Sequence, residues 1–194
     1  MKISEYKSTI PEGVSGNWKV EKFIVSEFDE KLEIMRSMFS FSSRGRYTPQ
    51  GDYTRLMRNG TCVMSDTPDE LRDQRFAILE AKNHVLINGL GLGCIAELCL
   101  MKPEVSFVTV IEISEDVINL VGNYLKAKYP DKLNIVLADA MEFKPLKGAK
   151  FGMVWHDIWD NICSDNLPEM KKLHRKYGRY TEWQGSWCRE RCIP

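Results

Sequence analysis

The chain has 194 residues, 27 of them basic and 27 acidic, so its formal net charge is zero. This length supports one ordinary core, which we divide into an N-terminal extension, 1–66, and a main domain, 67–194. Neutrality removes any global attraction to nucleic acid or to an anionic membrane, although a local basic patch remains compatible with it. The N-terminus lacks the apolar centre of a signal peptide, and no apolar run approaches the ~20 residues that span a bilayer. We therefore expect a cytoplasmic protein without a membrane partner.

The six cysteines do not form a framework of regular spacings, and we expect them to be reduced. Cys188 and Cys192 would share one face of a C-terminal helix that His174 could approach. Without a Cys-x-x-Cys pair, two ordinary thiols are the better interpretation. We therefore expect no metal site.

In the N-terminal half, alternation of apolar and polar residues predicts a strand over 18–25. Apolar residues at helical spacing predict a helix over 29–39. The polar segment 40–52 is long for a connection, which is typical either of a lid or of a mobile surface loop. Two short strands, 53–58 and 61–65, flank Asn59-Gly60, the pair that favours a type I′ turn. The extension therefore contains a β-hairpin.

The main domain opens with a predicted helix. Thr67 is placed as its cap, Pro68 at its first position, and Glu70 where its carboxylate can reach back to the cap amide. This helix should run to about Lys82 and lead the chain into the first central strand.

Strands and helices then alternate along the chain. Short apolar runs predict four strands, at 85–87, 107–111, 133–137 and 151–155. Helices are predicted over 95–101, from the cap Ser114 onward, and over 167–177. This alternation predicts an α/β fold with a doubly wound, mostly parallel sheet.

Functional groups gather at the predicted strand ends. Gly89, Gly91 and Gly93 follow the first strand, and Glu112 ends the second strand about 20 residues later, where a carboxylate can accept both hydroxyls of a ribose. Asp139 follows the third strand and Asp157 the fourth. Ligands of such sheets bind outside the carboxyl ends of the strands, so we expect a nucleotide-like ligand there.

The glycine spacing separates two classes of cofactor. A dinucleotide fingerprint needs a third glycine where this chain has Cys94. Gly-x-Gly-x-Gly instead resembles motif I of the class I S-adenosylmethionine-dependent methyltransferases, and the resemblance extends over 84–160. It implies a Rossmann-like fold that binds S-adenosyl-L-methionine. Many members carry an acidic residue just before the first glycine, where this chain has Asn88, whose amide could join a path to the methionine amine.

The resemblance implies a set of cofactor-binding residues. These are Asn88, Gly89, Leu90, Gly91, Gly93, Glu112, Ile113, Asp139, Ala140 and Asp157.

Within this superfamily the chain is most similar to the spermidine synthases. Asp157 and Asp160 reproduce their Asp-x-x-Asp spacing, Asp69-Glu70 matches their Asp-Glu pair, and 182–186 matches their fifth strand. This resemblance implies an aminopropyltransferase that uses decarboxylated S-adenosylmethionine. The chain departs from it in two ways: Leu92 replaces an aspartate of their glycine loop, and Asp73 replaces a tyrosine.

The C-terminal part is shortened relative to that branch, because only 16 residues follow Gly178. The missing strands would leave an open sheet edge that a second subunit could cover, so we expect a homodimer.

We assign catalysis to Asp157 and Asp160, which could hold an amine and aim it at the sulfonium carbon. The alternative for Asp160 is a cap of the following turn. His156 is either a base beside the site or a packed, hydrogen-bonded residue.

Aromatic and basic residues add two weaker signals. Tryptophans 155, 159, 183 and 187 either wall a substrate pocket or pack in the core. Four arginines, at 44, 46, 55 and 58, are as readily explained by solvation as by phosphate contacts, so we do not expect a nucleic-acid partner.

The sequence as a whole predicts a methyltransferase that acts on a small molecule. Aminopropyl transfer is the first alternative, and a non-catalytic protein that binds the cofactor or a partner is the second.

Overall fold

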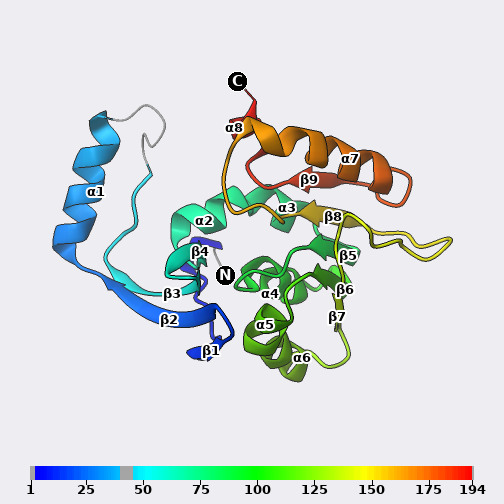
Figure 1. The fold of residues 1–194 in the computed structure, drawn as a ribbon, viewed down its shortest axis with the longest axis horizontal. Coiled ribbons are helices and arrows are strands. Elements are labelled where there is room, and N and C mark those ends of the chain that lie inside the picture. The colour runs from blue at the N-terminus through cyan, green and yellow to red at the C-terminus, as the bar shows by residue number, and fades with distance from the viewer. Residues whose placement is uncertain (1–2, 40–45, 194) are drawn as a thin grey trace.

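A computed structural model describes residues 3–39 and 46–193 and contains two β-sheets (Figure 1). One is a parallel sheet of five strands in the order β7-β6-β5-β8-β9, and the other is an antiparallel sheet in the order β1-β2-β3-β4. The antiparallel strands are β1 Gly13–Ser15, β2 Trp18–Val25, β3 Gly51–Arg58 and β4 Thr61–Ser65. The parallel strands are β5 Asn83–Asn88, β6 Val105–Glu112, β7 Leu133–Leu137, β8 Met153–His156 and β9 Gln184–Ser186.

The strand order confirms the predicted α/β fold with a doubly wound sheet. From β5 the chain moves outward to β6 and β7, and then returns to the other side of β5 for β8 and β9. The strand order therefore reverses beside the carboxyl end of β5, which is where ligands of such sheets bind. The helices are α1 Glu27–Phe39, α2 Pro68–Asp73, α3 Arg75–Glu80, α4 Cys94–Leu100, α5 Glu115–Val117, α6 Asn123–Lys128, α7 Leu167–Tyr177 and α8 Arg189–Cys192.

The two faces of the parallel sheet are covered differently. Val85 and Ile87 of β5 belong to a large apolar cluster that includes residues of α3, α4, α5 and α6. Leu86 points to the other face, into a smaller cluster with Leu173 and Tyr177 of α7. The connection from β7 to β8 contains no helix, so α7 is the described helix that contributes to this second cluster.

Helix α4 is the centre of the larger cluster, because every one of its residues is buried. The parallel sheet packs on one side of it. The same cluster also includes Leu56 and Met64 of the antiparallel sheet and Tyr6 of the segment before β1. A continuous core therefore joins the two sheets.

The N-terminal half contains the predicted hairpin. Asn59 and Gly60 both have positive φ, 49° and 80°, as a type I′ turn requires. The predicted strand 18–25 is confirmed as β2, which pairs with β3 over its whole length. The hairpin is thus half of a four-stranded sheet rather than an isolated pair of strands.

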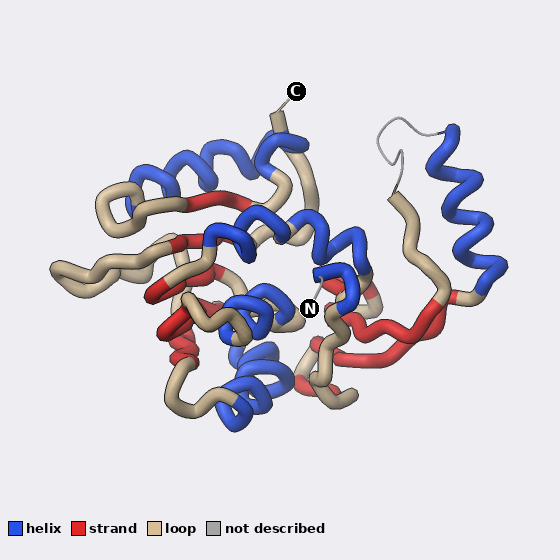
Figure 2. The backbone as a smooth tube through the Cα atoms, turned by 180° about the vertical axis from the view of Figure 1, so that it is seen from behind, coloured by secondary structure: helices blue, strands red, loops and turns tan. Residues whose placement is uncertain are grey.

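The predicted amphipathic helix forms α1, which lies at one end of the molecule in both ribbon views (Figures 1 and 2). Its expected apolar stripe is not buried, since Met35 is 52% exposed and Phe39 is 87% exposed. The proposed lid or surface loop, 40–52, includes residues 40–45, which lie outside the described residues. Beyond them, Arg46 donates to both carboxylate oxygens of Asp73 at 2.7 and 2.9 Å.

The helix predicted from Thr67 to Lys82 is broken in the middle. It forms as α2 and α3, with Gln74 between them at φ −93° and ψ −4°. Thr67 is the N-cap residue and Pro68 opens α2, as predicted, but the predicted capping hydrogen bonds do not form. The Thr67 side chain makes no cap, and Glu70 accepts the amide of Ser65 at 3.3 Å instead. The break at Gln74 is what turns its side chain toward the carboxyl end of β8.

Among the described helices, none combines the length and the apolar character needed to cross a bilayer.

Candidate functional site

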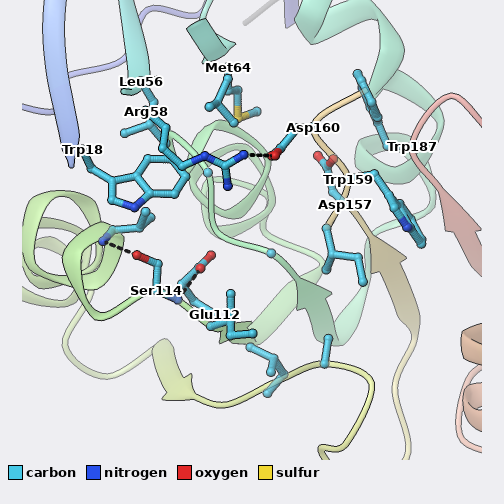
Figure 3. A pocket seen from close by; sticks show the side chains of 18 of the residues that line it. Trp18, Leu56, Arg58, Met64, Glu112, Ser114, Asp157, Trp159, Asp160 and Trp187 are labelled. Atoms are coloured by element: carbon cyan, nitrogen blue, oxygen red, sulfur yellow. Dashed lines mark hydrogen bonds and ion pairs between the residues drawn. The ribbon is translucent and has the colours of Figure 1, made fainter. Parts of the chain in front are cut away.

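A pocket of about 210 Å³ opens at the carboxyl ends of the parallel strands, between them and the antiparallel sheet (Figure 3). Figure 3 shows Arg58 and Met64 on one side of it and Glu112 and Ser114 on the opposite side. Of the predicted site residues, those that line it are Gly89, Gly91, Glu112, Ile113, Asp139, Ala140, Asp157 and Asp160. The fold thus brings together residues from the ends of four neighbouring strands, β7, β6, β5 and β8.

The glycine turn allows close approach of protein atoms as well as of a ligand. Gly89 has a φ of 95°, and a Cβ there would lie 1.9 Å from the carbonyl oxygen of Asp157. Gly91 has a φ of 53°, and a Cβ there would lie 2.5 Å from Sδ of Met64. Met64 therefore covers the main chain at Gly91 in this structure, and the assignment of Gly91 to the cofactor stays a prediction.

Glu112 is held rigidly at the end of β6. Its Oε2 accepts the amide of Leu90 at 2.7 Å, and its Oε1 accepts the amide of Ser114 at 2.8 Å. Each carboxylate oxygen has a second lone pair, so the side chain retains acceptor capacity at the pocket. This arrangement suits recognition of neighbouring hydroxyl groups.

The turn after β7 forms another wall. Asp139 Oδ1 accepts the amide of Met141 at 2.7 Å, which fixes the turn. Ala140 beside it is buried, and Ile113 across the pocket is 69% exposed. A flat ligand that carries a polar edge would meet apolar side chains on its faces and the Asp139 carboxylate at its rim.

Two carboxyl groups with raised pKa values meet at the end of β8. Burial, with a further contribution from the charge of Glu70, raises the pKa of Asp157 to about 7. Burial is also the main cause that raises the pKa of Glu70 to about 7. Both residues line the pocket, so it contains two acids whose pKa values lie near neutral pH.

Gln74 completes this group. Its Nε2 donates to Asp157 Oδ2 at 3.3 Å, while its buried Oε1 has no hydrogen-bond partner among the described residues. A buried acceptor without a partner is costly, so it marks a position where a ligand N–H would be stabilised.

Asp160 lies at the mouth of the pocket. It forms an ion pair with Arg58, and the guanidinium of Arg58 also lies 5.2 Å from the ring centre of Trp18. Because β3 carries Arg58 and the loop after β8 carries Asp160, this pair ties the two sheets together across the opening.

Three predicted cofactor residues lie outside the lining of the pocket. Asn88 is fully buried and donates to His156 Nδ1 at 2.8 Å. Leu90 contributes its amide to Glu112 but buries its side chain, and Gly93 packs against Leu125. Their assignment to the cofactor remains a prediction, and in this structure the contacts named above are all with protein groups.

His156 is a packed residue rather than a base beside the site. Burial lowers its pKa to about 3, so the ring is neutral. Its Nδ1 accepts from Asn88, which places the proton on Nε2, 3.4 Å from Gln184 Oε1.

The four C-terminal tryptophans divide between the two roles considered for them. Trp155 and Trp183 stack with ring centres 6.3 Å apart and pack in the core. Trp159 and Trp187 line the pocket beside Asp160, and the indole of Trp159 donates to Glu169 at 2.9 Å.

Sequence reasoning missed several lining residues as site residues. For Glu70, the match of Asp69-Glu70 to the Asp-Glu pair of the spermidine synthases is the signal that could have found it. Gln74, Met64 and Trp18 carried no signal, because only the break after α2 and the packing of the antiparallel sheet bring them to the pocket.

No known family model and no curated protein sequence matches the chain. Similar solved structures include the 23S rRNA methyltransferase ErmE, with 17% identity over 59% of this chain and 43% of that chain and a TM-score of 0.44. The N-methyltransferase NodS from Bradyrhizobium japonicum WM9 has 13% identity over 57% of this chain and 58% of that chain, with a TM-score of 0.42. An S-adenosylmethionine-dependent methyltransferase from Clostridium acetobutylicum ATCC 824 has 15% identity over 59% of this chain and 44% of that chain, with a TM-score of 0.40.

The matched region therefore spans about half the length of these proteins. Similarity at this level says nothing about the roles of individual residues, which are argued from the geometry of the pocket.

Proposed function

We propose that this chain is an S-adenosylmethionine-dependent methyltransferase whose acceptor is a small molecule with a basic nitrogen. One observation carries the proposal: the same pocket contains Glu112, suited to a ribose, and a pair of proton-exchanging acids, Asp157 and Glu70. When bound, the cofactor supplies an electrophilic methyl carbon on a sulfonium.

The cofactor half of the pocket would be formed by Glu112, Asp139 and the apolar side chains beside them. The remaining lone pairs of Glu112 support binding of the two ribose hydroxyls, because its backbone contacts fix the carboxylate in place. The exposed Asp139 carboxylate would accept from the adenine amine, with Ile113 and Ala140 against the ring.

The acceptor half would be formed by Asp157, Glu70, Gln74 and two tryptophans, Trp159 and Trp187. A basic nitrogen finds carboxylates to balance its charge and aromatic rings beside it. Since the pKa values of Asp157 and Glu70 lie near 7, either carboxylate can take the proton that an ammonium must lose before it attacks. The free Oε1 of Gln74 supports orientation of the nitrogen through a hydrogen bond.

The pocket has to widen when it is occupied. Its volume of about 210 Å³ is below the ~300–1,000 Å³ of ordinary ligand sites. Met64 over Gly91 and the ion pair of Arg58 with Asp160 are the groups that narrow it. Ligand entry would therefore displace the Met64 side chain and part this ion pair.

Calorimetry tests the cofactor. We expect S-adenosylmethionine and S-adenosylhomocysteine to bind wild-type protein, and Glu112→Gln to weaken both at least tenfold by removing a charged acceptor. Asp131→Asn, a change at an exposed carboxylate away from the pocket, is the matched control. Binding of NAD alone would refute the proposal.

Aminopropyl transfer is the second candidate, favoured by the position of Glu70 opposite Asp157. It requires tight binding of decarboxylated S-adenosylmethionine and turnover with a diamine such as putrescine. Asp157→Asn separates both reactions from a non-catalytic role. If the cofactor still binds this variant and no acceptor is turned over by either protein, the chain is a binding protein.

A further inference from the structure

A second depression, of about 880 Å³, lies between the 144–150 loop and the end of α7. In both ribbon views this loop is at the opposite end of the molecule from α1 (Figures 1 and 2). We call this depression the basic pocket. The cations that line it are Lys144, Lys147, Lys150, Arg175, Lys176 and Arg179, and no acidic side chain lines it.

The positive charge of the basic pocket is concentrated in two short segments. The segments 144–150 and 171–179 contain eight of the 27 basic residues of the chain and no Asp or Glu. None of the six lining cations forms an ion pair with a described carboxylate, whereas Arg46, Arg58 and Lys128 elsewhere do. A chain of zero net charge therefore presents a strongly positive surface at one end.

Backbone contacts hold two of these cations in place. Lys176 Nζ donates to the carbonyl oxygens of Ala140 and Met141, both at 2.9 Å. Lys150 Nζ donates to the carbonyl oxygen of Arg179 at 3.1 Å. When an anion binds in the pocket, these two side chains are already in position, so less side-chain conformational entropy is lost on binding.

The cations also repel one another. Burial lowers the pKa of Lys176, and the neighbouring charges of Lys172 and Lys144 lower it further, against a partial offset from Glu142 and Asp139. Bound anionic groups would relieve this repulsion. A single phosphate neutralises too little of it, and a chain of phosphates matches six cations better.

The concave shape of the basic pocket and one aromatic residue in its lining indicate which class of polyanion fits it. Tyr180 lines the basic pocket, with the guanidinium of Arg179 4.9 Å from its ring centre. A positively charged groove with an aromatic side chain is typical of proteins that bind single strands, where bases stack on the ring. A membrane surface is flat and would contact a concave site poorly, although Leu146 at the loop tip is 83% exposed.

We propose that the basic pocket binds the phosphate backbone of a single-stranded nucleic acid. This inference is independent of the proposed methyl transfer. It also replaces the expectation of no nucleic-acid partner, which rested on net charge and on arginines of the N-terminal half.

Fluorescence anisotropy with the full chain and a labelled polyuridylate of about 20 nucleotides tests the proposal. With about five phosphate contacts, affinity should fall about 100-fold between roughly 50 and 200 mM salt. The double variant Lys144→Glu/Lys147→Glu changes two exposed lysines, neither of which is one of the two that backbone carbonyls hold in place. It should lose at least tenfold in affinity and show a shallower salt dependence.

The matched control is Lys126→Glu/Lys132→Glu, which makes the same change in net charge at two exposed lysines outside the basic pocket. It should bind within about threefold of wild type. Calorimetry with S-adenosylmethionine should give the same result for all three proteins, which separates this inference from the proposed function. Equal losses in both double variants, or no binding at low salt, would overturn it. So would binding of phosphatidylserine vesicles without binding of the oligonucleotide.

Discussion

Arg58 of the antiparallel sheet forms an ion pair with Asp160, in the loop after β8, across the mouth of the pocket. The two side chains are 43% and 46% exposed, so solvent screens the pair and its contribution to stability is small. We expect the ion pair to affect the rate of ligand entry instead, because it lies at the mouth of the pocket.

Arg58→Gln should therefore change ligand entry more than stability. We expect less than about 1 kcal/mol of destabilisation in urea unfolding, because exposed ion pairs contribute that much at most. The association rate constant of S-adenosylhomocysteine, measured by stopped-flow fluorescence, should rise. An unchanged or slower rate would show that the pair does not restrict entry. Arg55→Gln, which breaks the pair with Glu21 in the same sheet, is the control.

The raised pKa values of Asp157 and Glu70 predict a pH dependence of stability. Their folded-state pKa values, about 7, lie above the ordinary values of 3.8 and 4.5. The folded state therefore holds protons that the unfolded state releases. This contribution is fully present below about pH 4 and is lost as pH rises toward 7. For each proton that only the folded state retains, the free energy of unfolding falls by up to about 1.4 kcal/mol per unit rise in pH.

Asp157→Asn/Glu70→Gln removes both groups and should flatten the stability profile between pH 4 and 7 relative to wild type, as measured by urea unfolding at each pH. Asp131→Asn, at an exposed carboxylate, should leave the profile unchanged. Parallel profiles for wild type and the double variant would contradict the raised pKa values.

Two glycines with positive φ should respond very differently to alanine. At Gly89 a Cβ would lie 1.9 Å from a backbone oxygen, so β5 and the segment after β8 must separate. We expect a loss above about 3 kcal/mol. At Gly60, with φ of 80°, a Cβ meets nothing within 4 Å, and the conformational cost alone is about 1 kcal/mol. Similar losses in the two variants, by urea unfolding, would disprove the close approach.

Glu97 of α4 anchors the segment before β1 through Tyr6. It accepts hydrogen bonds from Tyr6 Oη and Lys128 Nζ, both at 2.6 Å. Glu97→Leu should cost about 2–4 kcal/mol, because the Tyr6 hydroxyl is buried and loses its acceptor, while Lys128 is partly exposed and can recover water. A double-mutant cycle with Tyr6→Phe should show coupling of at least about 0.5 kcal/mol. Additive losses would mean that the hydrogen bond contributes nothing.

Local chemistry made parts of the fold predictable from sequence. Asn59-Gly60 defines a turn by its own backbone preference, and the apolar run 133–137 coincides with β7. Helix α7 was predicted to its observed bounds, because its buried stripe, Met170 to Tyr177, follows the helical period and ends before Gly178.

The rest depended on tertiary contacts that no local pattern contains. The apolar stripe of α1 correctly predicted a helix, but not that Met35 and Phe39 on it stay exposed. The break at Gln74 interrupts a segment with good helical signals at both ends, because packing places α2 and α3 against different partners. At the site, strand-end position identified Glu112 and Asp157, whereas Met64 and Trp18 reach the pocket only through the docking of the antiparallel sheet.

The complete burial of α4 has a consequence for how the molecule opens. Its side chains belong to the cluster that includes residues of both sheets, so we expect that neither sheet can detach without opening this shared core to water. The N-terminal strands and the parallel sheet should therefore unfold as one cooperative unit despite their separation along the chain. In native-state hydrogen exchange, the amides of α4 should exchange only through global unfolding, with the same denaturant dependence as those of β5.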